Sequence, residues 1–536
     1  FQPADRPNAP SYFRVGQSNI ARVSNGETWG YTVENLLFYD KTIKEDHKFN
    51  FTALYGIQES QSFDNFVQKQ GITEDFVSFY NLALSSPIDA ANTGLGGGES
   101  RWALISYMGR MNYAYKDRYL LTVTYRRDGS SRLAPGNQWF DYPAVSAGWV
   151  VSDENFMANS KNISYLKLRA GWGRTSNQAI NPYASKGLVS NNNGLNPSGD
   201  IGAAGTIIRY NFGPTIVTGY NVVSLPNPNL SWEFTSTTNI GLDFGLFNNR
   251  ITGTLELYNS RTDRILYNVN LPVTSGIEGA FTTNIGEMSN KGFELSLSSV
   301  NVKSASGFTW STDLNLFTNK NRLLKLSNQI DREIGSQLFV GHSMTAIYDY
   351  EKQGIWQLNE ADQAAALGAT PGMIKLADLS GPTGRPDGRV DADYDRKIIG
   401  DMDARLQGGL TNRFSYKGFD LGIVMHARFG GLLLSQIHGP AASYISQLSG
   451  RRNSIKVDFW TPTNPTNWFP MPAGEHATYS TLADGWRTLG YYDASFVRVR
   501  SINLGYAFRP AVLQKVGAQN ARDNLTVDNV SVLRST

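Results

Sequence analysis

The stretch Asn239-Ile-Gly-Leu-Asp-Phe-Gly-Leu-Phe-Asn-Asn-Arg-Ile-Thr-Gly-Thr-Leu-Glu-Leu-Tyr258 decides the fold class, because hydrophobic and polar residues alternate along both of its halves. Successive side chains of a β-strand point to opposite faces, so residues 240, 242, 244 and 246 form one apolar face. The alternation resumes after the Asn248-Asn249 pair, a combination typical of tight turns. The stretch therefore predicts a β-hairpin with one apolar and one polar face.

The same alternation recurs along the chain, at 293–298, 308–316 and 419–428. In each case acidic or amide side chains occupy the polar face at mid-strand. A soluble two-sheet sandwich and a membrane barrel both contain such strands. Alternation by itself therefore leaves these two all-β architectures open.

Composition favours the membrane barrel. The chain has 536 residues, with 52 Gly, 26 Tyr, 27 Phe and 11 Trp, and only 18% are charged, whereas soluble domains have about 25%. It contains no Cys, which excludes disulfides, thiol catalysis and Cys-type zinc sites. The net charge of +3 is too small to indicate nucleic-acid binding.

Short and long connections alternate between the predicted strands, as they do in outer-membrane barrels. Long polar or Gly-rich links occupy 59–101, 128–138, 176–228, 321–403 and 431–494. Region 337–357 is then a strand-like part of an outer loop. The predicted wall strands are 28–40, 46–58, 102–115, 119–127, 139–151, 162–175, 229–245, 250–268, 284–299, 306–319, 404–416, 419–430, 495–508 and 522–532.

Several segments, in order along nearly the whole chain, carry a family resemblance. They are Tyr125-Arg-Arg-Asp-Gly-Ser-Ser-Arg132, Tyr142-Pro-Ala-Val-Ser-Ala-Gly-Trp149, Leu166-Lys-Leu-Arg-Ala-Gly-Trp-Gly173, Asn284-Ile-Gly-Glu-Met-Ser-Asn-Lys-Gly-Phe-Glu294, Phe459-Trp-Thr-Pro-Thr-Asn-Pro465 and Phe496-Val-Arg-Val-Arg-Ser-Ile-Asn-Leu-Gly-Tyr506. With them the chain resembles the SusC-like (SusC/RagA) branch of the TonB-dependent outer-membrane transporters of Bacteroidota.

The resemblance implies an all-β fold, a transmembrane antiparallel β-barrel of 22 strands with an internal plug and long extracellular loops. We expect residues 1–536 to form part of that barrel. The plug and first strands of the family are not recognised in this sequence, nor is a closing strand. Since open sheet edges are untenable in lipid, we expect further strands to complete the barrel.

The resemblance also implies a function and partners. Such a transporter lies in the Gram-negative outer membrane and imports a glycan or peptide into the periplasm. It works beneath a SusD-like surface lipoprotein, is energised through the TonB–ExbB–ExbD complex, and can form a dimer of such pairs. A non-transporting surface barrel or adhesin is the alternative function, and a soluble carbohydrate-binding sandwich is the third class.

Aromatic residues of the long loops are the candidates for substrate binding, because flat rings stack on sugar faces. Such rings equally pack within loops or against a protein partner. The candidates are Tyr183, Tyr210, Phe212, Tyr220, Tyr444, Trp468, Phe469 and Trp486. Trp460 is the poorest candidate, because its Phe-Trp-Thr-Pro context resembles a structural motif of the family.

Two groups of acidic residues are further candidates. Asp243, Glu256, Glu294 and Asp313 lie in register for the polar face, where they either contact a plug or merely solvate the wall. The segment 378–395 resembles the family's Asp-x-Asn-Gly-Asp-Gly-x-Ile-Asp loop, whose spacing suits Ca²⁺. Its Asp378, Asp387, Asp391 and Asp395 form a degenerate version, so we expect either a calcium site or a solvated acidic loop.

An enzyme is not indicated. The five His residues have neither metal-ligand spacing nor a nucleophile beside them. Gly94-Leu-Gly-Gly-Gly98 lacks the Lys-Ser/Thr of a phosphate-binding loop.

Overall fold

The computed structural model describes residues 20–70, 80–84, 93–190, 209–269, 274, 281–326, 330–438, 457–471, 485–514 and 517–534. Fourteen strands form one large sheet, in which each strand is hydrogen-bonded to the next large strand along the chain. They are β1 (Ile20–Ile43), β2 (His47–Gln70), β3 (Thr93–Tyr115), β4 (Tyr119–Ser130), β5 (Trp139–Val150), β6 (Ile163–Asn177), β11 (Glu233–Leu246), β12 (Ile251–Asp263), β15 (Glu287–Lys303), β16 (Thr309–Lys325), β23 (Leu406–Tyr416), β24 (Phe419–Phe429), β27 (Phe496–Ala507) and β28 (Arg522–Arg534).

Each of the fourteen predicted wall strands corresponds to one strand of this sheet. Region 337–357 contributes only to small two-stranded sheets outside it, as predicted. The first three strands are longer than predicted, since β1 and β2 contain 24 residues each and β3 contains 23. The alternation of hydrophobic and polar residues weakens in the Gly- and Ser-rich ends of these strands, so the sequence pattern does not reveal them. The ends still pair, because backbone hydrogen bonds between strands do not require that alternation.

Two predicted strands extend too far into the connection between β12 and β15. The strand predicted at 250–268 ends at Asp263 as β12, and the strand predicted at 284–299 begins at Glu287 as β15. Arg264 and Gly286 have φ values of +55° and +82°, which a β-strand cannot continue through. The segments beyond them form a separate pair, β13 (Leu266–Val269) with β14 (Phe281–Asn284).

The two faces predicted for the opening hairpin are present. A Cβ built at Gly253 would lie 2.6 Å from the ring of Phe244, so these residues share the apolar face. On the other face, a Cβ at Gly241 would lie 2.8 Å from the guanidinium of Arg169. Hydrophobic side chains such as Ile240 and Leu257 are 57% and 53% exposed on their face.

The chain divides into two compact units, each described by itself: unit 1 (Phe1–Ser146, Trp172–Ser236, Thr262–Ile285) and unit 2 (Ala147–Gly171, Thr237–Arg261, Gly286–Thr536). Unit 1 has its own core of Leu133, Ala134, Leu230 and Trp232. The indole of Trp232 donates a hydrogen bond of 3.0 Å to the carbonyl of Gln138. Residues 229–232 are predicted as the start of a strand, but β11 begins only at Glu233, and Leu230 and Trp232 belong to this core.

The smaller elements of unit 1 lie in its connections. Besides β13 and β14 they are β7 (Leu188–Ser190), β8 (Arg209–Phe212), β9 (Thr215–Thr218), β10 (Asn221–Ser224) and η1 (Leu82–Leu84). The strand pairs are β8 with β9 and β10 with β7.

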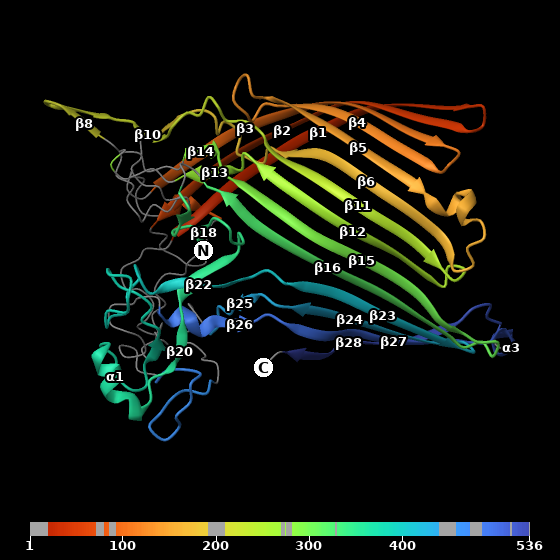
Figure 1. Ribbon diagram of the computed structural model, residues 1–536. Helices are drawn as coiled ribbons and strands as arrows, with labels where there is room; N and C mark the ends of the chain where they lie inside the picture. Colours follow the sequence, from red (N-terminus) through yellow and green to blue (C-terminus); the bar gives the residue numbers. More distant parts are fainter. Residues whose placement is uncertain are drawn as a thin grey trace. The chain divides into compact units, whose positions relative to one another are not determined.

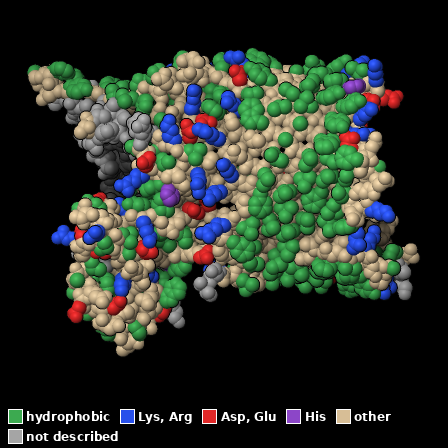
Figure 2. Space-filling model, viewed as in Figure 1, with side chains coloured by type: hydrophobic (Ala, Val, Ile, Leu, Met, Phe, Trp, Pro, Cys, Tyr) green, Lys and Arg blue, Asp and Glu red, His purple; other side chains and the backbone are tan. Residues whose placement is uncertain are grey.

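In unit 2, the strands from β15 to β28 run side by side, with short turns at one end and a lobe of loop residues at the other (Figure 1). On the face shown in Figure 2, hydrophobic side chains cover the middle of these strands, and charged ones lie toward both the loop end and the turn end. The small strands are β17 (Arg332–Glu333), β18 (Leu338–Phe339), β19 (Ala346–Tyr350), β20 (Lys352–Ile355), β21 (Ile374–Leu376), β22 (Arg396–Asp401), β25 (Leu432–Leu434) and β26 (Tyr491–Asp493).

Helices in the described part of the chain are few and short. In unit 2 they are η2 (Val151–Asp153), η3 (Asn155–Met157), η6 (Leu358–Glu360), α1 (Ala361–Ala366), η7 (Gly485–Gly490) and α3 (Pro510–Leu513). Among the described residues, no helix has the length and apolarity needed to cross a membrane.

Candidate functional site: a loop lobe with two cavities and a polar strand face

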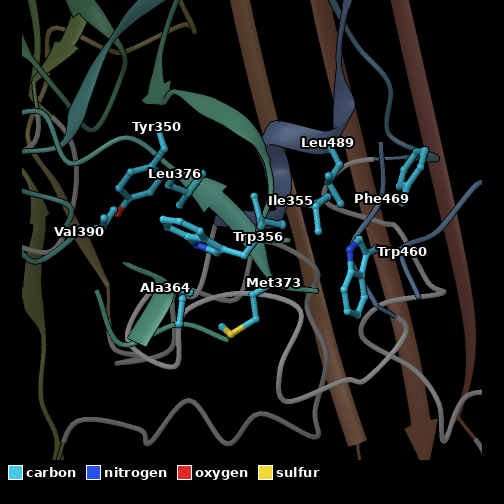
Figure 3. Packing of buried hydrophobic residues seen from close by; sticks show 12 residues of the cluster. Tyr350, Ile355, Trp356, Ala364, Met373, Leu376, Val390, Trp460, Phe469 and Leu489 are labelled. Atoms are coloured by element: carbon cyan, nitrogen blue, oxygen red, sulfur yellow. The ribbon is translucent and has the colours of Figure 1, made fainter. Parts of the chain in front are cut away.

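The long loops of unit 2 fold into one lobe with a hydrophobic core (Figure 3). Residues from 350–390 pack there against residues from 460–489, although these segments are far apart in the sequence. The core contains Tyr350, Ile355, Trp356, Ala364, Ala369, Met373, Ile374, Leu376, Val390, Trp460, Phe469 and Leu489. This apolar core holds the loop backbone in place beside the strand ends.

Polar contacts of the 457–471 segment fix it against β20. The indole of Trp460 donates to the side-chain oxygen of Gln357 at 2.9 Å. The amide oxygen of Asn467 accepts the backbone N–H of Ile355 at 3.1 Å. Trp460 is only 2% exposed, so it is a structural residue, in agreement with the interpretation of its sequence context.

One cavity of about 520 Å³ lies beside this core, and we call it the lysine cavity. Aromatic rings and two lysines dominate its lining. The lining residues are Tyr350, Glu351, Lys352, Lys397, Ile398, Ile399, Leu432, Trp468, Phe469, Thr488, Leu489, Tyr491 and Tyr492. A concave surface that combines aromatic rings with convergent polar groups is a common form of a ligand site.

A second cavity, of about 850 Å³, adjoins the first, because Ile399 and Leu432 line both. We call it the polar cavity. Its lining includes Asn319, Asn321, His342, Ser343, Asp401, Asp403, Arg405 and Asp493. Asp403 accepts hydrogen bonds from Asn321 at 2.5 Å and from Ser343 at 2.6 Å, which orients this wall.

A buried carboxylate stabilises the wall of the lysine cavity. Asp349 is 3% exposed and accepts hydrogen bonds from the hydroxyl of Tyr491 at 2.5 Å and from the backbone N–H of Tyr350 at 2.8 Å. The guanidinium of Arg487 lies 3.8 Å away. Burial, and then the bond to Asp349, raise the pKa of Tyr491, while burial raises the pKa of Tyr350 to about 12. Both phenols therefore stay neutral at physiological pH.

The polar strand face is built around Arg169 on β6. Its guanidinium binds Asp243 on β11 at 2.9 Å and Glu256 on β12 at 2.8 Å. Thr254 also donates to Asp243, at 3.2 Å. The predicted carboxylates Asp243 and Glu256 are thus brought together by one cation.

The other two predicted carboxylates lie further along the same face. Asp313 accepts a hydrogen bond of 2.7 Å from Ser298 and forms an ion pair with Arg413. Glu294 is exposed on β15, near the hydroxyl-bearing ring of Tyr258. Contact of these groups with a plug stays a prediction.

The predicted aromatic residues fall into separate places. In unit 1, Tyr210 and Phe212 form an edge-to-face pair with centroids 6.4 Å apart, and Tyr210 donates to the carbonyl of Tyr220 at 2.9 Å. The hydroxyl of Tyr183 accepts the backbone N–H of Arg101 at 3.2 Å.

In unit 2, only Trp468 and Phe469 of the predicted aromatic residues can be assigned to the lysine cavity. Trp468 is 59% exposed, whereas Phe469 is 6% exposed and belongs mainly to the core. Tyr444 and the side chain of Trp486 lie outside the described residues. Substrate binding by any of the eight aromatic residues stays a prediction.

The acidic loop 378–395 is closed by backbone amides. Asp395 is fully buried and accepts the N–H groups of Leu379 at 2.6 Å, Ser380 at 3.1 Å and Asp391 at 2.7 Å. Asp378 accepts from Gly388, Asp387 from Arg389, and Asp391 from Asp393 and Tyr394.

The carboxylates of this loop bind mainly to the loop's own backbone. Within the described parts of the chain, no three acidic or histidine side chains gather as a metal site requires. A calcium ion takes six to eight oxygen ligands, and these carboxylates already accept backbone N–H groups. The calcium site therefore stays a prediction from the loop's resemblance.

Sequence reasoning did not single out two side chains of the candidate site, Arg169 and Lys352. Arg169 follows the alternation of its strand, which places it on the polar face, but only the strand register shows that it meets Asp243. Lys352 stands in the aromatic-rich stretch Tyr348-Asp-Tyr-Glu-Lys-Gln-Gly-Ile-Trp356. A cation among aromatic residues is the one sequence feature that could have indicated it. Loop folding alone places it in a cavity.

Comparison with known proteins places these features in a family. Residues 4–359 match the family described as TonB dependent receptor-like, beta-barrel. The chain belongs to this family. Its members are outer-membrane β-barrel proteins of Gram-negative bacteria and not enzymes, so the predicted antiparallel β-barrel class, location and lack of enzymatic activity are confirmed. The 22 strands and the internal plug stay predictions.

Curated relatives support the SusC type, and solved structures support the fold. TonB-dependent receptor P26 of Formosa agariphila is 31% identical over 97% of this chain and 50% of its own length. TonB-dependent receptor SusC of Bacteroides thetaiotaomicron is 29% identical over 85% of this chain and 41% of its own. The structure of the RagAB peptide importer in its open-open state aligns with a TM-score of 0.75 and 20% identity over 96% of this chain and 52% of that one.

The chain spans about half the length of the curated relatives it matches. The fold likeness to RagAB extends over that portion. Completion of the barrel by further strands stays a prediction.

Proposed function

We propose that this chain forms wall and outer loops of an outer-membrane transporter that imports a glycan or peptide nutrient into the periplasm. TonB supplies the energy through the TonB–ExbB–ExbD complex. A SusD-like surface lipoprotein acts as the lid, and the lipid of the outer membrane surrounds the apolar face. Two such pairs can form a dimer.

The observation that carries the proposal is the combination of an apolar and a polar face on the same strands. Exposed Ile240 and Leu257 suit contact with lipid, while the ion-paired Arg169, Asp243 and Glu256 suit an aqueous interior. Membership of the TonB-dependent receptor family supports energised transport over a passive pore.

The loop lobe supports nutrient capture. Its two adjoining cavities lie among loops that form an ordered core, and binding residues are commonly carried on loops that a rigid scaffold positions. A non-transporting surface barrel or adhesin is the alternative, and TonB-dependent uptake distinguishes it from a transporter.

The test is uptake by cells of the native host. The gene is deleted and restored, and uptake of labelled oligosaccharide and peptide mixtures is compared with and without TonB. We expect uptake to require both the gene and TonB, and the SusD-like lipoprotein to co-purify with the receptor. Surface binding without TonB-dependent entry would instead support the adhesin.

A pair of variants links uptake to the lobe. Trp468→Ala removes a ring that is 59% exposed at the lysine cavity, and Phe156→Ala removes one that is 69% exposed on η3. We expect severalfold slower uptake for Trp468→Ala alone, because a stacking ring contributes to ligand binding. Equal effects would contradict a role for the cavity.

A further inference from the structure

The lysine cavity contains a cation, Lys352, that has no carboxylate partner among the described residues. Two lysines line it. Lys397 forms an ion pair of 2.7 Å with Glu351. For Lys352, the described residues provide no carboxylate partner, and its ammonium donates one hydrogen bond, of 2.6 Å, to the carbonyl of Trp468. An ammonium has three N–H donors, so two remain for a ligand.

The surroundings of Lys352 make this charge costly. Burial lowers the pKa of Lys352 from its ordinary value of 10.5 to about 8. The nearby carboxylates are already engaged, Glu351 by Lys397 and Asp349 by Tyr491 and Arg487. Lys352 is half-buried, and a partly desolvated cation with free N–H donors gains a strong, charge-assisted hydrogen bond from an anionic ligand.

We propose that the lysine cavity binds a carboxylate of the transported nutrient, with Lys352 as its ionic contact and the exposed ring of Trp468 against the neighbouring part of the ligand. This inference rests on the proposed function and adds the chemical class of the substrate. A uronic acid unit of an oligosaccharide and the C-terminal residue of a peptide both have this chemistry.

The polar cavity suits the rest of such a ligand. It shares Ile399 and Leu432 with the lysine cavity. Its amide, hydroxyl and carboxylate groups at Asn319, Ser343 and Asp401 match the hydroxyl or amide groups of an oligomer. The ligand would thus place its carboxylate near Lys352 and extend along the polar wall.

The proposal predicts a pH dependence with a definite sign. Lys352 binds a carboxylate only when protonated, so affinity should fall as pH rises through about 8. The other titratable groups that line this cavity are Glu351, Lys397, Tyr350, Tyr491 and Tyr492. The pKa values of the three tyrosines are raised by burial, so these phenols remain neutral in that range. Lys352→Arg should bind at pH 9 as it does at pH 7, because guanidinium stays charged.

The experiment measures binding to the purified full-length receptor by calorimetry, using two matched probe pairs. The first pair is an oligogalacturonate and its methyl ester, and the second is a short peptide with a free or an amidated C-terminus. We expect one acidic probe to bind about tenfold or more tightly than its neutral form. The pair that shows this difference identifies the source of the carboxylate.

Lys352→Met should abolish that difference while leaving the neutral probe unchanged, and Lys397→Met, which removes an already paired lysine, should retain it. If the acidic and neutral probes bind alike in both pairs, or if Lys352→Met and Lys397→Met weaken binding equally, the proposal is overturned. Because binding is measured without transport, TonB-dependent uptake in cells still reports on the proposed function separately.

Discussion

At the residue scale, the polar face of this wall depends on a few half-buried charges. Arg169 has a side-chain exposure of 30%, and its partners Asp243 and Glu256 have 24% and 25%. The single positive charge of Arg169 thus partly balances the negative charges of two carboxylates on neighbouring strands. Removing it would leave two like charges facing each other in a partly desolvated place.

We therefore expect Arg169→Met to lower the free energy of unfolding by about 1–3 kcal/mol. The full-length protein in detergent, unfolded by heat and followed by tryptophan fluorescence, provides the measurement. Arg413→Met is the control, because Arg413 and Asp313 are more exposed, at 59% and 34%, and such pairs contribute about 0–1 kcal/mol. A larger effect of the control would refute the assignment.

Asp395 closes the acidic loop by accepting three backbone N–H groups while fully buried. In Asp395→Asn the side-chain NH2 group would replace one accepting oxygen and face backbone N–H groups that it cannot accept. We therefore expect the free energy of unfolding to fall by about 1–3 kcal/mol. Asp387→Asn, at an exposed position with one such bond, should be nearly neutral. Thermal unfolding with calcium and with chelator tests the calcium prediction too, since calcium would raise the midpoint of the wild-type protein.

At the element scale, close approach between neighbouring strands depends on small residues. A Cβ at Gly292 on β15 would collide with the carbonyl oxygen of Thr318 and lie 2.5 Å from the hydroxyl of Tyr258. That hydroxyl donates to the side chain of Asn319 at 3.1 Å. The absence of a side chain at Gly292 therefore lets Tyr258 cross β15 to reach β16.

Gly292→Ala should displace Tyr258 or bend β15, and we expect less folded receptor in the outer membrane. The matched control is Gly109→Ala on β3, where a Cβ would meet nothing within 4 Å. Quantitative immunoblots of outer-membrane fractions compare the two variants. Tolerance of Gly292→Ala at the level of Gly109→Ala would show that β15 has room that the structure does not indicate.

At the scale of the whole molecule, the two faces of the sheet define its relation to the membrane. Leu257 is 53% exposed on the apolar face, and Ser296 is exposed on the polar face, where it donates to Asn315 at 2.9 Å. An arginine on the lipid face of a barrel costs about 2–4 kcal/mol at the bilayer midplane and less near the interfaces.

Leu257→Arg should therefore reduce the amount of receptor inserted in the outer membrane, whereas Ser296→Arg should be tolerated. Heat-modified mobility of the full-length protein on gels distinguishes folded from unfolded molecules. The reverse ranking would mean that the lipid and water faces have been exchanged.

The sequence by itself determined the strands, their faces and the family, because alternation with period two is a local property that each strand carries. It placed Asp243 and Glu256 on the polar face and marked 337–357 as loop. The exact end of a strand, such as Asp263 in β12, was not predictable from the sequence. The strand ends there because Arg264 adopts a left-handed backbone conformation, which hydrophobic alternation does not reveal.

The tertiary structure alone decided which side chains meet. Arg169 reaches Asp243 through strand register, and Lys352 reaches Trp468 through the folding of loops more than 100 residues apart. Such contacts depend on packing between distant segments, which local periodicity does not encode. The half-buried Lys352 lines a cavity only because the loops fold together, and it is the strongest indication of substrate chemistry.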